Sequence, residues 1–240
     1  MWDRSLITRG IADVVGARGR VVGGDSNPAL IDQARQLHRD VPQLEFEVGD
    51  IFNLTYKDEF HIVTSARVLQ WLPDPLKALE TMISASKMGG KVLILDYNHE
   101  KISWEPEPPL CMQSFYTSFL KWRSDAGMDN KIADNLLSLF EQVGLDEIKI
   151  TLQHELTNRM DHDFHERISI WADVAASRGI QMVKDDYLTE QERATGEKDY
   201  REWIDQSAMS QKMYLLAVEG TKSTSLKRCK SIYPVKKEMY

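Results

Sequence analysis

The sequence holds little cysteine and no long apolar run. Its 240 residues include 2 cysteines, Cys111 and Cys229, which are too few and too widely spaced for a disulfide framework or a zinc site. A reducing cytoplasm is therefore the expected compartment. Charged residues interrupt the first 15 positions, so these form neither a signal peptide nor a membrane span, and no other segment is apolar over a sufficient length.

An excess of positive charge is also missing. The formal net charge is -7 and the pI is about 5.4. A general binder of nucleic acid or of a membrane surface needs a net attractive basic face, so both classes are disfavoured. Small-molecule or protein partners are expected, and nothing in the sequence indicates an oligomeric state. With 42% hydrophobic and 28% charged residues, the chain is typical of a globular protein with one main domain.

Helical and strand patterns alternate through the first hundred residues. The sequence predicts a helix up to Val15, a helix capped by Asn27 with Pro28 at its first position, and a helix capped by Asp74 with Pro75 at its first position and Gly89-Gly90 as its stop. The strands predicted between and after them are Arg20–Gly24, Leu44–Val48, His61–Ser65 and Lys91–Asp96. This order favours an α/β fold, an open and mostly parallel sheet with helices on both faces.

The second half of the chain is less regular. It predicts a proline-rich loop over 104–109, helices over Cys111–Arg123 and Lys131–Val143, and strands over Asp146–Leu152 and Met213–Val218. The roughly sixty residues between the last two strands exceed any simple connection and predict a mostly helical cap. We expect one domain over 1–220, with cap segments at about 100–130 and 155–210, and a disordered basic tail over 221–240.

Two carboxylates end neighbouring predicted strands. In a doubly wound sheet, ligands bind outside the carboxyl edge, where Asp25 can accept hydrogen bonds from a ribose diol. Asp50 follows the next strand and can accept the exocyclic amine of an adenine that packs on Ile51. A simple turn aspartate is the alternative for Asp25, although a second acid on the same edge favours a nucleotide site.

Four segments, in order and correctly spaced, resemble the class I S-adenosylmethionine-dependent methyltransferases of the type 11 and domain 25 groups. They are Arg20-Val21-Val22-Gly23-Gly24-Asp25-Ser26-Asn27, Glu47-Val48-Gly49-Asp50, Ser65-Ala66-Arg67-Val68-Leu69-Gln70-Trp71-Leu72-Pro73-Asp74 and Met88-Gly89-Gly90-Lys91-Val92-Leu93-Ile94. The run over 67–74 is similar to the trans-aconitate methyltransferase branch. The likeness covers roughly residues 9–152 and implies a Rossmann-like three-layer sandwich.

The resemblance also implies a cofactor, S-adenosyl-L-methionine, and a small-molecule methyl acceptor. Its cofactor-binding residues would be Asp25 and Ser26 at the ribose and Asp50 with Ile51 at the adenine. Ser65, Ala66 and Arg67 would lie beside the methionine part, although Arg67 is alternatively a surface residue.

One part of the family pattern is absent from the sequence. In this family a central strand and a glycine-rich turn precede the ribose strand, but Met1 to Thr8 is too short to hold both, and no glycine precedes Gly10. We therefore expect a truncated or remodelled chain. If the family's sheet order holds, the strands ending at Asp25 and Ser65 would face each other with unpaired edges.

The candidate catalytic residue is His99, which follows the strand ending at Asp96 and could act as a general base. A merely polar loop is the alternative. His162 and His165 lie three residues apart, but no complementary ligand run accompanies them, so we predict no metal site.

Three functional classes stay open. The first is methyl transfer to a small molecule. The second is a noncatalytic binding protein that kept the α/β body and lost the glycine turn. The third is a nicotinamide-dependent oxidoreductase, which would use Asp25 for a ribose but lacks a preceding Gly-x-Gly-x-x-Gly.

Overall fold

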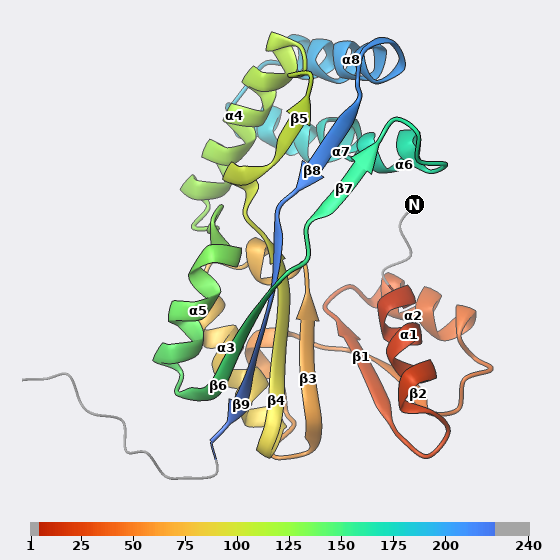
Figure 1. Ribbon diagram of the computed structural model, residues 1–240, viewed down its shortest axis with the longest axis vertical. Helices are drawn as coiled ribbons and strands as arrows, with labels where there is room; N and C mark the ends of the chain where they lie inside the picture. Colours follow the sequence, from red (N-terminus) through yellow and green to blue (C-terminus); the bar gives the residue numbers. More distant parts are fainter. Residues whose placement is uncertain (1–4, 224–240) are drawn as a thin grey trace, which may run out of the picture.

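The computed structural model describes residues 5–223 and contains an α/β body with a second unit above it (Figure 1). Helix α1 (Ser5–Val15) is followed by β1 (Val21–Asp25), α2 (Pro28–Leu37) and β2 (Leu44–Val48). β1 and β2 pair in parallel, with Asp25 opposite Val48. As expected, Asn27 caps α2 and Pro28 stands in its first turn.

The N-terminal unit, which we define as α1, β1, α2 and β2, has a small core of its own. Phe46 is the largest side chain in this core, whose buried members are Ala12, Val21, Ile31, Ala34, Val41, Leu44 and Phe46. A methyl group added at Gly23 would come within 2.9 Å of both Thr8 and Phe46. The absence of a side chain at Gly23 therefore lets α1 pack closely on β1.

The main sheet has the strand order β3-β4-β9-β6. Its strands are β3 (Phe60–Ala66), β4 (Ser86–Tyr97), β6 (Leu145–Leu152) and β9 (Leu215–Lys222). β3, β4 and β6 point the same way and β9 runs against them. Helices α3 (Pro75–Ala85) and α5 (Ile132–Gln142) pack on this sheet. The predicted α/β class with mostly parallel strands is confirmed.

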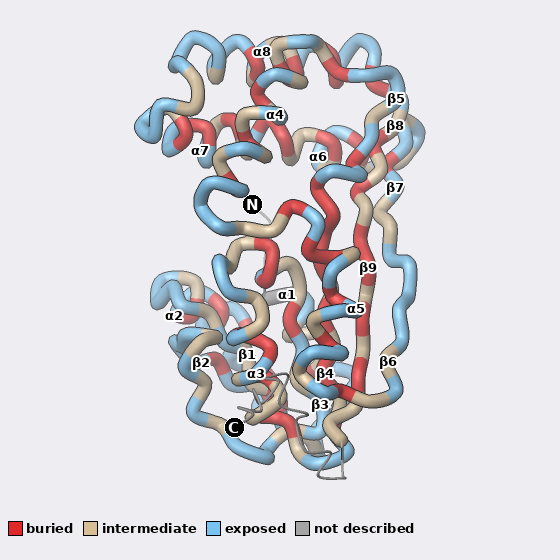
Figure 2. Tube along the Cα trace, turned by 90° about the vertical axis from the view of Figure 1, so that its left-hand side faces the viewer, coloured by how far each residue is buried: buried red, intermediate tan, exposed pale blue. Residues whose placement is uncertain are grey.

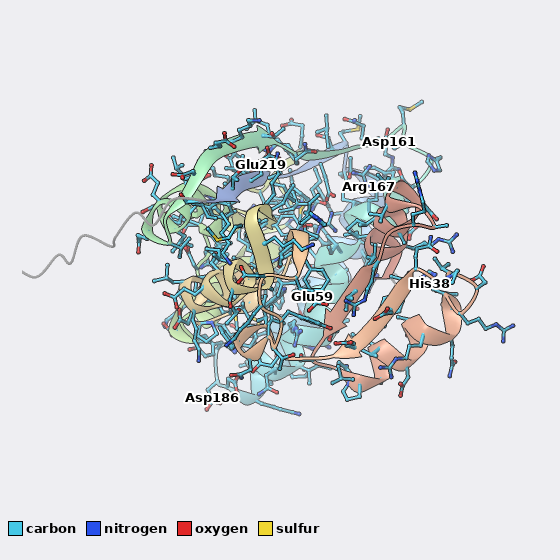
Figure 3. All side chains as sticks on the ribbon, turned by 90° about the horizontal axis from the view of Figure 1, so that it is seen from below. His38, Glu59, Asp161, Arg167, Asp186 and Glu219 are labelled. Carbon is cyan, nitrogen blue, oxygen red and sulfur yellow. The ribbon has the colours of Figure 1, made fainter. Side chains whose placement is uncertain are left out.

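The N-terminal unit and the main sheet are not joined by a ladder. Within residues 5–223, β1 pairs with β2 alone and β3 pairs with β4 alone. Arg20, just before β1, links the two parts, because it binds Glu45 in β2 at 3.0 Å and Glu59 just before β3 at 2.6 Å. In Figure 3, His38 of the N-terminal unit and Glu219 of β9 lie on different sides of the molecule, with Glu59 between them.

The upper unit consists of three short antiparallel strands and four helices. The strands, in the order β5-β8-β7, are β5 (Ser103–Glu105), β8 (Ser210–Met213) and β7 (Glu155–Asn158). The helices are α4 (Leu110–Asp125), α6 (Phe164–Ile168), α7 (Ile170–Lys184) and α8 (Glu190–Gln206). Figure 2 shows that buried residues follow β4 and β9 and continue into this unit. They connect the upper unit to the main sheet.

Three local expectations need correction. Helix α3 ends at Ala85, and Gly89 and Gly90 lie inside β4, where a bulge places Phe60 opposite Ser86 and Ile62 opposite Lys91. A methyl group at Gly90 would lie 2.5 Å from Ser86 Oγ, so the bulge, rather than a helix stop, needs this glycine. The strand predicted over Met213–Val218 is divided between β8 and β9, and the mostly helical cap also contains strands.

The end of the described chain also differs from the expectation. Thr221 and Lys222, which the sequence assigns to the tail, pair within β9. The rest of the predicted tail, from residue 224, lies outside the described residues. None of the helices in residues 5–223 is long and apolar enough to cross a membrane.

Candidate functional site

The two predicted carboxylates lie together at the carboxyl edge of the N-terminal unit. Asp25 ends β1 and is half-buried, and the backbone amide of Asn27 donates to its Oδ1 at 2.8 Å. Its Oδ2 makes no hydrogen bond within residues 5–223. The backbone amide of Gly49 donates to the Asp25 carbonyl oxygen at 3.0 Å, which ties the ends of β1 and β2 together. Ser26 is exposed in the turn that follows Asp25.

Asp50 and Ile51 lie just beyond β2. Asp50 begins the short 3-10 helix Ile51–Asn53 and accepts hydrogen bonds from the Phe52 amide at 2.9 Å and the Asn53 side chain at 2.7 Å. Its carboxylate is exposed, and each oxygen keeps a lone pair for a further donor. Ile51 is half-buried and packs against the core of the main sheet.

Ser65 and Ala66 form the carboxyl end of β3 and Arg67 follows it, next to the edge that carries Asp25 (Figure 1). The hydroxyl of Ser65 is buried and has no hydrogen-bond partner among the described residues. Buried polar atoms are normally satisfied, so an unpaired hydroxyl at a sheet edge is a candidate ligand contact. Arg67 adopts a φ of 61°, a left-handed conformation that is uncommon for a residue with a side chain.

The side chain of Arg67 points toward the upper unit. It forms an ion pair with Glu155 of β7, and its guanidinium lies 5.4 Å from the ring centre of Tyr97. Its Nε is buried without a partner in the described part of the chain. Arg67 is thus half-buried at the junction between the main sheet and the upper unit, and the alternative of a plain surface residue is not supported.

His99 lies in a buried polar network behind this edge. It is 4% exposed, and its Nε2 is 2.5 Å from Gln70 Oε1. Burial first, and Arg123 second, lower the pKa of His99 well below its usual value, so the imidazole is neutral. Its Nδ1 has no partner among the described residues, and neither cavity described below is lined by His99.

The rest of this network consists of residues that the sequence patterns did not indicate. Asp96 is fully buried at the end of β4 and accepts from the backbone amides of Gln70 at 3.2 Å and Tyr97 at 3.0 Å. Burial raises the pKa of Asp96 to about 7 and lowers that of Arg123 to about 10. Arg123 of α4 donates to the Gln70 carbonyl at 2.7 Å and to Asn130 at 2.8 Å. Asp96 could have been identified as a candidate site residue from its position at the end of a predicted strand. Nothing in the sequence distinguishes Arg123 from other helix residues.

Two cavities lie near these residues. The larger, about 470 Å³, is formed by α2 and β2 and is lined by Arg35, His38 and Phe46 among others. The smaller, about 20 Å³, lies between the main sheet and the upper unit and is lined in part by Arg67 and Tyr97. Neither is lined by Asp25, Asp50 or Ser65, which lie at the open strand edge.

The residues present fit an adenosine-containing cofactor in part. Asp25 has a free oxygen for a ribose hydroxyl, and the unpaired Ser65 hydroxyl accounts for one polar contact further along the edge. Gly24 and Gly49 leave open space, since a methyl group at Gly49 would have no atom within 4 Å and one at Gly24 would have only a carbonyl oxygen at 4.0 Å. A ligand can therefore approach the protein backbone closely at both strand ends.

Comparison with known proteins gives a consistent picture. A family model described as "Methyltransferase domain" matches residues 6–164. A demethylmenaquinone methyltransferase of Staphylococcus haemolyticus is 27% identical over 161 residues, which cover 60% of this chain and 65% of that protein. The match thus spans less than two thirds of the length of that relative.

Solved structures share the fold at low sequence identity. Phosphoethanolamine N-methyltransferase 2 of Haemonchus contortus, solved with S-adenosylhomocysteine, is 17% identical with a TM-score of 0.52 and covers 90% of this chain and 46% of that chain. The cyclase SpnF is 14% identical with a TM-score of 0.51 and covers 90% of this chain and 71% of that chain. At such identities the likeness concerns the fold alone, and the fold does not dictate the reaction.

Proposed function

This chain belongs to the methyltransferase-domain family, and from that premise we propose that it transfers a methyl group from S-adenosylmethionine to a small-molecule acceptor. The observation that carries the proposal is the shared strand edge. Asp25 ends β1 and Asp50 follows its parallel partner β2, while Ser65 and Ala66 end the neighbouring strand β3 and Arg67 follows it. Ligands of open α/β sheets bind outside this edge.

Each residue has a distinct task in the proposal. Asp25 accepts hydrogen bonds from the ribose hydroxyls beside Ser26, while Asp50 accepts from the adenine amine and Ile51 packs against the ring. Ser65, Ala66 and the backbone of Arg67 lie beside the methionine part. Charged hydrogen bonds of the kind made by Asp25 contribute about 1.5–3 kcal/mol each.

The chemistry asks little of the protein beyond positioning. When bound, S-adenosylmethionine supplies an activated methyl group that passes to the acceptor by an in-line displacement. The chain must hold the acceptor in line and, where the acceptor releases a proton, give that proton a base. His99 as this base stays a prediction, and its neutral imidazole has the protonation state that a base requires.

A pH–rate profile separates a base from a structural residue at position 99. If His99 takes the proton, His99→Gln lowers kcat and removes the acid limb of the profile. If its role is to hold Gln70, the same variant lowers the free energy of unfolding and leaves the shape of the profile unchanged, and the base assignment is then rejected.

The first experiment addresses the cofactor. Calorimetric titration of the full chain with S-adenosylhomocysteine should show micromolar binding, at least tenfold weaker for Asp25→Ala because a charged hydrogen bond to the ribose is lost. NADH is the control ligand. Asp32→Ala is the matched control variant, since Asp32 is an exposed carboxylate on α2 whose ion pair with Arg35 is a surface contact.

A specific observation favours a second candidate function. β1 and β3 do not pair with each other within the described residues, so the edge that would hold the methionine part is not continuous. A noncatalytic binding protein of this family fits that arrangement. A folded chain that binds neither S-adenosylhomocysteine nor NADH would leave this candidate in front, whereas NADH binding that depends on Asp25 would favour the oxidoreductase.

A further inference from the structure

A small cavity at the junction of the main sheet and the upper unit is positively charged. Its volume is about 20 Å³, enough for about one water molecule while Glu155 is paired with Arg67. Arg67 and Tyr97 line it from the main sheet, and Glu155, Arg167 and Met213 are among the residues that line it from the upper unit. Two arginines therefore face one glutamate across this space.

Of the two arginines that line the cavity, Arg167 is the one whose side chain has no partner among the described residues. It lies on α6 and is half-buried, and its side chain makes no hydrogen bond, ion pair or ring contact with any described residue. Half-buried arginines usually bond to a carboxylate or a carbonyl oxygen, because the guanidinium carries five donors. An unengaged guanidinium at the wall of a cavity indicates an anionic partner from outside the chain.

Arg67 has unused donor capacity in the same cavity. Glu155 takes one end of its guanidinium, while Nε is buried and unpaired. Its backbone is held at a φ of 61° by a hydrogen bond of 2.7 Å from its amide to the Leu95 carbonyl. Such a conformation is uncommon for a residue with a side chain and is enriched at functional sites.

We propose that this cavity binds a carboxylate group of the methyl acceptor, held jointly by Arg167 and Arg67, with Glu155 as the partner of Arg67 when no acceptor is bound. This deepens the proposed function and rests on it. A carboxylate is the group that Arg67 already binds, and the planar guanidinium matches it with two parallel hydrogen bonds. The cavity receives the carboxylate alone, and the rest of the acceptor lies outside it, toward the end of β3.

The test is a titration that needs no methyl transfer. Benzoate and the uncharged benzamide, which match in size, are added to the full chain labelled with 13C in its methionine methyl groups, with the Met213 signal as reporter. Benzoate should shift this signal and bind at least tenfold more tightly than benzamide. Arg167→Gln should weaken benzoate binding by about tenfold or more, because a charged pair of hydrogen bonds is lost.

Two further variants sharpen the assignment. Glu155→Gln should strengthen benzoate binding, since it removes the carboxylate that competes for Arg67. Arg178→Gln makes the same charge change at an exposed arginine of α7 that does not line the cavity, and it should leave benzoate binding unchanged. None of the three variants should alter the affinity for S-adenosylhomocysteine.

Several outcomes would overturn the proposal. They are equal affinities for benzoate and benzamide, benzoate binding that persists in Arg167→Gln, or tighter binding of inorganic phosphate than of benzoate. Because the titration is run with and without S-adenosylhomocysteine, a failure of the cofactor site shows in that ligand alone. Charge-selective benzoate binding would then stand on its own.

Discussion

Arg123 and Arg178 illustrate how burial changes the role of the same residue type. Their guanidinium groups lie 4.7 and 5.1 Å from the ring centre of Trp71. Arg123 is fully buried and donates to Gln70 and Asn130, whereas Arg178 is exposed. Trp71 thus contacts one buried cation and one exposed cation.

We expect Arg123→Met to lower the free energy of unfolding by about 2–4 kcal/mol, because it leaves the Gln70 carbonyl and the Asn130 amide oxygen without donors in a buried place. Arg178→Met should change it by about 0.5 kcal/mol, the value of an exposed cation–π contact. Urea unfolding measures both. Equal losses in the two variants would mean that the buried hydrogen bonds of Arg123 stabilise the fold no more than the exposed contact of Arg178 does.

Asp96 and His99 should affect stability in opposite directions as the pH changes. The folded-state pKa of Asp96, about 7, lies above its usual value of 3.8. The stability that Asp96 contributes to the fold is therefore fully present below pH 3.8 and is lost as the pH rises through 7. The pKa of His99 is lowered, so its contribution is present above about 6.5 and is lost as the pH falls.

Two variants should separate these contributions. Relative to the parent chain, Asp96→Asn should gain stability as the pH rises from 5 to 7, at a rate of at most about 1.4 kcal/mol per pH unit. His99→Gln should gain relative stability as the pH falls below 6.5. Urea unfolding at a series of pH values checks both. If the free energy of unfolding of each variant changes with pH in the same way as that of the parent chain, the proposed pKa shifts of Asp96 and His99 are wrong.

At the scale of elements, the N-terminal unit depends on a close contact of α1 with β1. A methyl group at Gly23 would meet Thr8 and Phe46 at 2.9 Å, while one at Gly24 would have only the Glu47 carbonyl oxygen at 4.0 Å. Phe46 is central to the small core, so the neighbours of Gly23 cannot move without loosening this unit.

Gly23→Ala should therefore destabilise the N-terminal unit by about 1–3 kcal/mol, the usual cost of overpacking. Gly24→Ala, the adjacent control, should be neutral within about 0.5 kcal/mol. Hydrogen exchange resolved by segment is the measurement, with faster exchange expected in α1, β1 and β2 of Gly23→Ala and unchanged exchange in β4 and β9. A uniform increase over all strands would mean that the N-terminal unit has no separate stability.

At the scale of the whole molecule, the candidate cofactor site joins two parts that lack a common ladder. Asp25 and Asp50 belong to the N-terminal unit, whereas Ser65 belongs to the main sheet. A ligand that contacts all three must hold these parts together. The site and the cohesion of the molecule are therefore coupled.

Saturating S-adenosylhomocysteine should accordingly slow hydrogen exchange in the N-terminal unit more than in the upper unit. At a concentration one hundred times the dissociation constant, the expected stabilisation is about 2.7 kcal/mol. At the same ligand concentration, a tenfold loss of affinity in Asp25→Ala should reduce this stabilisation to about 1.4 kcal/mol. Protection confined to β3 and β4 would place the ligand on the main sheet alone.

The sequence by itself determined most of the elements and the pairing of the two acids at one edge. Proline and capping side chains mark where α2 and α3 begin, and the two-residue alternation of β2 marks its buried face. These signals act over a few residues, so they are readable without knowledge of the fold. Asp25 and Asp50 come together because parallel strands end at the same edge.

Only the tertiary structure decided how distant segments meet. The buried group of Asp96, His99 and Arg123 brings together residues up to 27 positions apart, and the cavity shared by Arg67 and Arg167 brings together residues 100 positions apart. The fold also leaves β1 and β3 without a common ladder. A local sequence pattern predicts which face of a helix or strand is buried, but it does not predict which element packs against that face. Long-range packing settles that, because the desolvation of an arginine or a carboxylate depends on every element around it.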